Sequence, residues 1–167
     1  MISQTAEYAL RAIVYLADQR GSPRTTAQIA EATQVPPGYL AKVMQSLSRT
    51  KLVHSQRGLN GGFTLTRDPA TLPMMEIIVA VDPIRRFHEC PLGLDTHHDD
   101  LCALHRTLEE AAQMLERKFT ETSMADLLNA SGDRKPLCRF PASPEAPAAT
   151  PTEGVSEASE SSEAGSE

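Results

Sequence analysis

The fold is decided by residues 25–67, which read TTAQIAEATQVPPGYLAKVMQSLSRTKLVHSQRGLNGGFTLTR. A cap at Thr25 or Thr26 predicts a short first helix, and the sequence Gln-Val-Pro at residues 34–36 ends it. Pro37 predicts the start of a second helix, since proline is tolerated where its missing amide donor is not needed. The second helix has apolar side chains at helical spacing on one face, namely Leu40, Val43, Met44 and Leu47. Two short helices joined by a tight turn predict a helix-turn-helix, with an ordinary helical hairpin as the alternative.

A predicted β-hairpin follows these helices directly. Residues 52–56 and 63–65 alternate as strands do, and the intervening residues 58–61 contain an Asn-Gly pair, which favours a tight hairpin turn. A hairpin in this position predicts a wing. The expected fold class is therefore mainly α, a winged helix-turn-helix DNA-binding domain with a β-hairpin wing.

Helical patterns flank this region on both sides. Residues 5–18, 74–81 and 124–128 are expected to be helices, and residues 101–119 form a longer one. The long helix has apolar residues at steps of three and four: Leu101, Leu104, Leu108, Ala111, Leu115 and Phe119. This stripe resembles a coiled-coil seam and predicts a dimerisation helix of a homodimer. The alternative is a helix that packs within its own domain.

Length and charge divide the chain into unequal parts. The 167 residues suit one domain, expected over residues 1–130, while residues 131–167 are rich in Pro, Ser, Ala and Glu and predict a disordered acidic tail. Residues 1–67 have a charge balance of +5, against -7 for residues 68–130 and -4 for the tail. A basic front half favours a polyanionic partner. The longest purely apolar run is residues 77–81, so we expect a cytoplasmic protein with no membrane partner.

The polar face of the second helix and the turn of the hairpin form the candidate DNA-binding surface. The residues expected to contact DNA are Tyr39, Lys42, Gln45, Arg49 and Arg57. Lysine and arginine would contribute salt-dependent phosphate contacts, and Gln45 could read a base edge. A symmetric dimer would suit double-stranded DNA with a palindromic operator. The alternative for each charged residue is an ordinary solvated side chain.

A second candidate site lies in residues 90–105, which read CPLGLDTHHDDLCALH. Thiolate and imidazole are the usual protein ligands of zinc and iron-sulfur clusters, so Cys90, Cys102 and His105 are candidate ligands within a sensor loop over residues 88–105. His97 or His98 could complete a zinc site. A reversible disulfide and inert packing are the alternatives, and Cys138 in the tail is expected to be incidental.

Residues 1–130 resemble the Rrf2 family of bacterial winged-helix regulators. The resemblance is carried by Glu7-Tyr8-Ala9-Leu10-Arg11, by Pro37 and Tyr39-Leu40, by the wing sequence over residues 57–67, and by the cysteine loop. It implies a transcription regulator, most often a repressor, that senses redox state, nitric oxide or iron-sulfur status through a bound cluster.

The resemblance also implies a ligand set, with one departure. Family members that bind a cluster have three cysteines with five residues between neighbours, and here the middle position is Thr96, which excludes a three-cysteine site. His105 matches the histidine ligand of IscR-like members, and Glu7 matches a carboxylate that NsrR-like members offer from the opposite subunit. The implied set of Cys90, Cys102, His105 and Glu7 suits a 2Fe-2S cluster, with zinc or no metal as alternatives.

Two other interpretations of the sequence remain open. A regulator without a cluster could switch by forming a disulfide between Cys90 and Cys102, or could be stabilised by zinc. The class furthest from this is an enzyme, either a zinc hydrolase or a thiol oxidoreductase. We expect no enzyme, because the sequence has no phosphate loop and does not pair the ligands with an evident general base.

Overall fold

A computed structural model describes residues 2–58, 60–91 and 101–130 of the chain. The fold is mainly helical with one two-stranded antiparallel hairpin, as predicted. Its elements are α1 (Gln4–Asp18), α2 (Thr26–Thr33), α3 (Pro37–Arg49), β1 (Val53–Gln56), β2 (Gly62–Leu65), η1 (Pro69–Thr71), α4 (Met74–Val81), α5 (Ala103–Glu121) and α6 (Met124–Leu128). The predicted acidic tail and the middle of the predicted sensor loop, with Thr96, His97 and His98, lie outside the described residues.

The core is built around α1, which packs against α2, α3, α4 and α6. Nine of its 15 residues are buried. The helix has so many small and branched apolar side chains that several neighbours can approach it closely. It therefore fixes the positions of the two helices of the helix-turn-helix.

Local sequence determines where α2 and α3 begin and end. Thr25 and Gln28 form a reciprocal capping box at the start of α2, and Gln34 ends this helix in the left-handed region with φ +56°. Pro37 opens α3, as predicted. The four predicted apolar residues of α3 are all buried: Leu40, Val43, Met44 and Leu47. The helix-turn-helix prediction is confirmed.

A one-residue backbone bridge joins the wing to the segment just before α2, the first helix of the helix-turn-helix. Val53 pairs with Leu65 and Gln56 with Gly62 in the hairpin, and Phe63 also forms an antiparallel bridge with Arg24, just before α2. Gly62 has φ +155°, and a Cβ there would lie 2.7 Å from the Arg24 backbone. The close approach therefore requires glycine at this position.

The far end of α5 returns to the core through α6. Pro73 and Ser123 form an isolated bridge, and the Met124 amide donates to the Leu72 carbonyl at 2.9 Å. The long helix begins two residues later than predicted, because Cys102 has extended backbone angles and takes the N-cap position. None of the helices in the described ranges has the length and apolar character needed to span a membrane.

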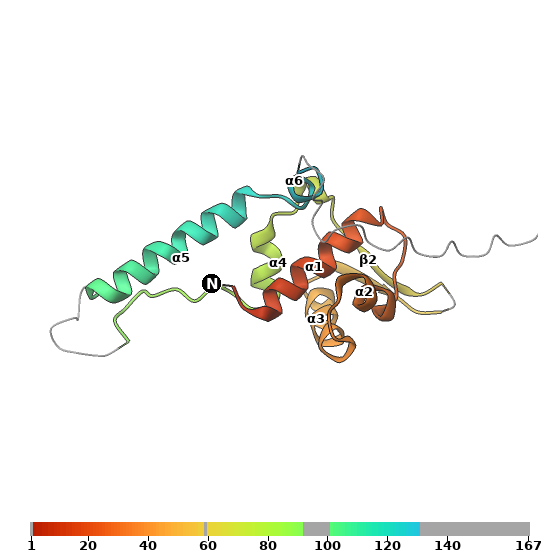
Figure 1. The fold of residues 1–167 in the computed structure, drawn as a ribbon, viewed down its shortest axis with the longest axis horizontal. Helices are drawn as coiled ribbons and strands as arrows, with labels where there is room; N and C mark the ends of the chain where they lie inside the picture. Colours follow the sequence, from red (N-terminus) through yellow and green to blue (C-terminus); the bar gives the residue numbers. More distant parts are fainter. Residues whose placement is uncertain (1, 59, 92–100, 131–167) are drawn as a thin grey trace, which may run out of the picture.

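Helix α5 and residues 82–91 together extend away from the core as an arm (Figure 1). Within the arm, the Arg86 guanidinium donates to the carboxylates of Glu109 and Glu116 on α5. We call these three residues the Arg86 cluster. The hydrogen bonds from Arg86 and from the Phe87 amide lower the pKa of Glu109 to about 2.

This pKa predicts that the arm weakens in acid. Because the pKa of folded Glu109 lies below its ordinary value of 4.5, the carboxylate stabilises the fold above that pH, and the contribution is lost as the pH falls towards 2. Glu109→Gln should therefore reduce the dependence of the unfolding free energy on pH between roughly pH 5 and pH 3. Urea titrations at several pH values would measure the free energy of unfolding. Glu110→Gln is the control, because Glu110 is an exposed neighbour of Glu109. An unchanged pH dependence in Glu109→Gln would contradict this assignment.

Candidate nucleic-acid interface and metal centre

The first candidate site is a polar hollow of about 760 Å³ between α3 and the wing. Its lining includes four of the five residues predicted to contact DNA: Lys42, Gln45 and Arg49 from α3, and Arg57 from the turn after β1. Burial of the apolar face of α3 turns these side chains outward. The structure thus brings together residues that are up to 15 positions apart in sequence.

The charge of this hollow is uniformly positive. Lys42, Arg49 and Arg57 line it together with neutral side chains, and no acidic residue is among the lining residues. Within the described ranges, the ion pairs involve none of these three cations. A concave surface of this kind raises the local concentration of anions and suits the phosphate groups of a nucleic acid.

Tyr39 lies apart from this hollow and contacts α1. Its hydroxyl is 2.8 Å from Thr5 Oγ1, and its ring packs edge-on against Tyr8 at a centroid distance of 5.5 Å. These contacts connect the start of α3 to α1. The side chain is still 40% exposed, so the DNA contact predicted for Tyr39 stays a prediction.

The second candidate site forms where residues 82–91 meet the start of α5. The sulfur of Cys102 is 3.2 Å from His105 Nδ1, and the sulfur of Cys90 is 3.6 Å from the same nitrogen. All three candidate ligand atoms lie within 4.8 Å of one another. Cys90 and His105 are buried, with 8% exposure each.

The start of α5 explains how Cys102 and His105 converge. Cys102 is the N-cap residue and His105 lies three positions later, in the first turn, so both side chains reach the same side of the helix. The backbone amide of His105, followed by the Cys90 side chain, lowers the pKa of the Cys102 thiol. A lowered pKa favours the thiolate, which is the form that binds metals.

The donor atoms fit a metal or a cluster. Two thiols and an imidazole are ligands that zinc and iron accept. The two sulfur–nitrogen separations, 3.2 Å and 3.6 Å, are close to the roughly 3.5 Å expected between tetrahedral ligands of one ion. Three donors leave room for a fourth ligand. The group could therefore hold a zinc ion, or part of the ligand set of an iron-sulfur cluster.

Glu7, the fourth predicted ligand, does not join this group within one chain. It lies on α1, where its carboxylate accepts a hydrogen bond from Arg11 Nε at 2.6 Å, and Arg11 also donates to the Thr33 carbonyl at 3.2 Å. The resemblance predicts that Glu7 serves the site of the opposite subunit. Its role as a ligand stays a prediction.

Sequence analysis did not single out Phe87 and Glu109, two residues beside the candidate ligands. The Phe87 ring packs against the His105 ring at a centroid distance of 5.2 Å, and Glu109 accepts the Phe87 amide at 2.8 Å. His105, Glu109, Ala112 and Glu116 are spaced by four, three and four residues, which places them on one face of α5. That spacing was the signal in the sequence that could have revealed Glu109. No such signal marked its partner Arg86, which lies in a segment without helical periodicity.

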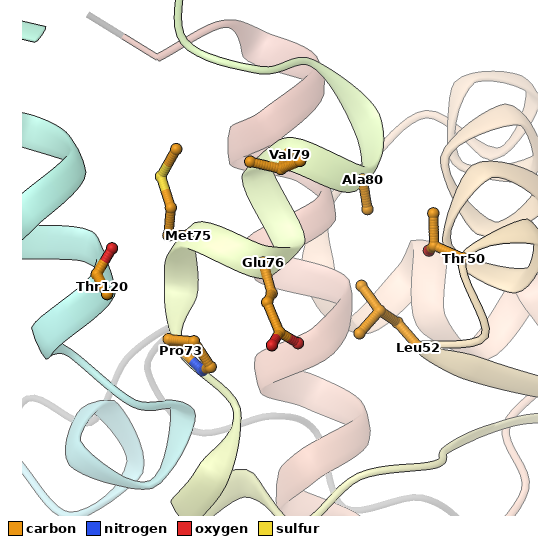
Figure 2. Close-up of a pocket in the computed structure, with 8 residues that line it drawn as sticks. All are labelled: Thr50, Leu52, Pro73, Met75, Glu76, Val79, Ala80 and Thr120. Carbon is orange, nitrogen blue, oxygen red and sulfur yellow. The ribbon is translucent and has the colours of Figure 1, made fainter.

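A further hollow of about 550 Å³ lies beside α4 and is lined mainly by apolar side chains (Figure 2). Among the residues drawn there, Glu76 is the one ionisable group, and its carboxylate pairs with Arg67 at 3.0 Å. The hollow thus offers apolar contact but no evident catalytic or metal-binding chemistry.

Comparison with known proteins identifies the family. Residues 2–130 match the model of the Rrf2 family, described as an iron-dependent transcriptional regulator. A protein of Aquifex aeolicus (strain VF5), named as an HTH-type transcriptional regulator, is 32% identical over 132 residues, which cover 77% of this chain and 92% of that protein.

Solved structures show the same fold. The IscR protein of T. potens has a TM-score of 0.63 at 24% identity, over 80% of this chain and 89% of that one. CymR, the global cysteine regulator of B. subtilis, has a TM-score of 0.62 at 22% identity, over 79% and 98% of the two chains. The fold, the family match and the relative in Aquifex agree, and the chain belongs to the Rrf2 family of DNA-binding transcriptional regulators and is not an enzyme.

Proposed function

We propose that this regulator is a homodimeric repressor whose affinity for DNA is set by a 2Fe-2S cluster. The ligands are Cys90, Cys102, His105 and Glu7 of the partner subunit. The observation that carries the proposal is the convergence of the two sulfurs and the imidazole at the start of α5. The description of the family as iron-dependent supports iron as the metal.

The exposed stripe on α5 supports a dimer. Leu104 and Leu108 are 64% and 43% exposed, although their spacing is that of a coiled-coil seam. Leu108 and Leu115 also line a hollow of about 420 Å³ with Ile2 and Ile84. Exposed apolar surface of this extent favours association, and a second copy of α5 would cover it. Each dimer would then present two α3 helices to the half-sites of a palindromic operator.

The protein's own packing offers a route from the metal centre to DNA. Cys90 belongs to the segment that follows α4, and α4 packs against both α1 and α3. Cys102 and His105 belong to α5, which also contacts α4. A bound cluster would supply a centre that reacts with oxidants or nitric oxide. A change in how Cys90 is held against α5 would shift α4, and a small rotation of α3 would alter the fit to both half-sites.

A single metal ion is the second candidate. The three donor atoms lie within 4.8 Å of one another, which suits one tetrahedral ion as well as it suits a cluster. In that case zinc or ferrous iron would brace the arm, and the regulator would respond to metal supply. Iron, sulfide and zinc analyses distinguish the two candidates.

The metal centre predicts the colour and metal content of the protein. Protein purified without oxygen should absorb visible light and contain iron and acid-labile sulfide, and Cys90→Ala should lose all three because one of the two thiolates is gone. Zinc without sulfide would favour the second candidate. Protein that remains metal-free after anaerobic reconstitution would contradict both and favour a thiol switch.

The polar hollow predicts the effect of removing Arg57. Arg57→Ala should weaken binding to the duplex that the wild-type protein selects from a random pool, and should reduce the salt slope by about one. Fluorescence anisotropy at several salt concentrations would measure both. Arg117→Ala removes the same charge from an exposed position on α5 and should leave the affinity unchanged. Equal affinities of Arg57→Ala and wild type would contradict the assignment.

The exposed stripe predicts the effect of a charge on the dimer. Leu108→Glu should convert the dimer to a monomer, because a carboxylate would be buried in the contact. Met114→Glu is the matched control, since Met114 is 62% exposed and, six residues after Leu108, lies about 120° away around α5 and outside the predicted stripe. Light scattering after size exclusion would measure the mass. A dimer in both variants would exclude this face as the interface.

A further inference from the structure

The candidate ligands come from two separate pieces of chain, so something must hold these pieces together. Cys90 follows α4, whereas Cys102 and His105 belong to the start of α5. Residues 92–100, which join the two pieces, lie outside the described residues. The contacts that bring Cys90 to His105 must therefore be sought between residues 82–91 and α5.

Glu109 is the centre of these contacts. It lies one turn after His105 and is buried. Its carboxylate accepts hydrogen bonds from Arg86 Nε at 2.8 Å, from the Phe87 amide at 2.8 Å and from Gln113 Nε2 at 3.1 Å. One carboxylate thus binds both a side chain and the backbone of the segment that carries Cys90.

The rest of the Arg86 cluster strengthens this attachment. Arg86 also donates to Glu116, two turns further along α5, so its guanidinium joins two positions of the helix. The Arg86, Glu109 and Glu116 side chains are only 28%, 11% and 27% exposed. Ion pairs that are partly shielded from water and carry several hydrogen bonds hold their geometry better than surface pairs do.

The same segment also fixes the orientation of the histidine ligand. Phe87, the residue after Arg86, packs its ring against the His105 ring at 5.2 Å between centroids. Its amide is the group that Glu109 binds, three residues before Cys90. The backbone amide that Glu109 binds, the ring that packs on His105 and the candidate ligand Cys90 therefore all lie within residues 87–90.

We propose that the Arg86 cluster is a positioning device for the metal centre. Arg86 and Glu109 fix residues 86–90 against α5, so that Cys90 and His105 lie at ligand distance before any ion binds. The inference rests on the proposed function of Cys90, Cys102 and His105 as metal ligands. Residues that orient ligands in this way commonly change metal affinity by about 10- to 100-fold when they are replaced.

The test is the affinity of the full-length protein for Co²⁺, a spectroscopic substitute for zinc or iron at thiolate sites. Metal-free, reduced protein is titrated without oxygen, and thiolate-to-cobalt absorption reports binding. The variants are Glu109→Gln, which keeps the size of the side chain but removes its charge, and Arg86→Lys, which keeps a charge but loses the planar fork. Glu110→Gln is the matched control, since Glu110 is the exposed neighbour of Glu109.

Two further readouts separate positioning from general stability. The melting temperatures of metal-free wild type and Glu109→Gln would set a titration temperature at which both proteins are fully folded, so that a lower Co²⁺ affinity does not reflect a loss of folded protein. Hydrogen exchange at the Phe87 amide should become faster in the same variant, since its acceptor is weakened.

Each result has a definite meaning. We expect Co²⁺ affinity to fall about 10-fold or more in Glu109→Gln, less in Arg86→Lys, and not at all in Glu110→Gln. Wild-type affinity in Glu109→Gln would overturn the positioning role while leaving the metal centre intact. If Cys90→Ala binds Co²⁺ as tightly as the wild type, both the metal centre and its positioning are overturned.

Discussion

The burial of one face of α3 is the constraint on which the rest of the structure depends. Leu40, Val43, Met44 and Leu47 pack into the core, and this fixes how the helix is rotated about its axis. The polar face then points outward beside the wing, and the Arg24–Phe63 bridge holds the wing in place. Core packing therefore fixes the backbone positions from which the cationic side chains of the polar hollow extend.

The arm has a different physical basis from the core. The arm buries few large apolar side chains. Its two parts, α5 and residues 82–91, are joined by a guanidinium, two carboxylates and a backbone amide. Such contacts depend on geometry and on the charge of each partner. An arm held in this way could move with the Cys90 and His105 ligands, and α4, which contacts both α5 and α3, would pass that movement to α3 as a small rotation. This division suits a sensor attached to a binding domain.

Much of the fold, but only part of the site, could be predicted from sequence. Periodicity located α3 and the hairpin because their apolar residues recur locally, and the Asn-Gly pair marked the turn. The Arg24–Phe63 bridge had no such signal, since one paired residue produces no pattern. Arg86 and Glu109 were missed because 23 positions separate them and a charged residue on a helix is ordinarily solvated. Cys90, Cys102 and His105 were singled out as candidate ligands because few residue types bind metals and because all three lie within residues 90–105, with His105 three positions after Cys102. The family resemblance pointed to the same three residues.

The most direct test of the account is the affinity of one preparation for its selected DNA with the metal centre loaded and then stripped. Anaerobic anisotropy titrations would compare the two states in wild type and in Cys102→Ser. The account predicts a change of at least about fivefold in the wild type, the lower end of ordinary coupling between two sites, and no change in the variant. Equal affinities of the loaded and stripped wild-type protein would show that the metal centre does not control DNA binding.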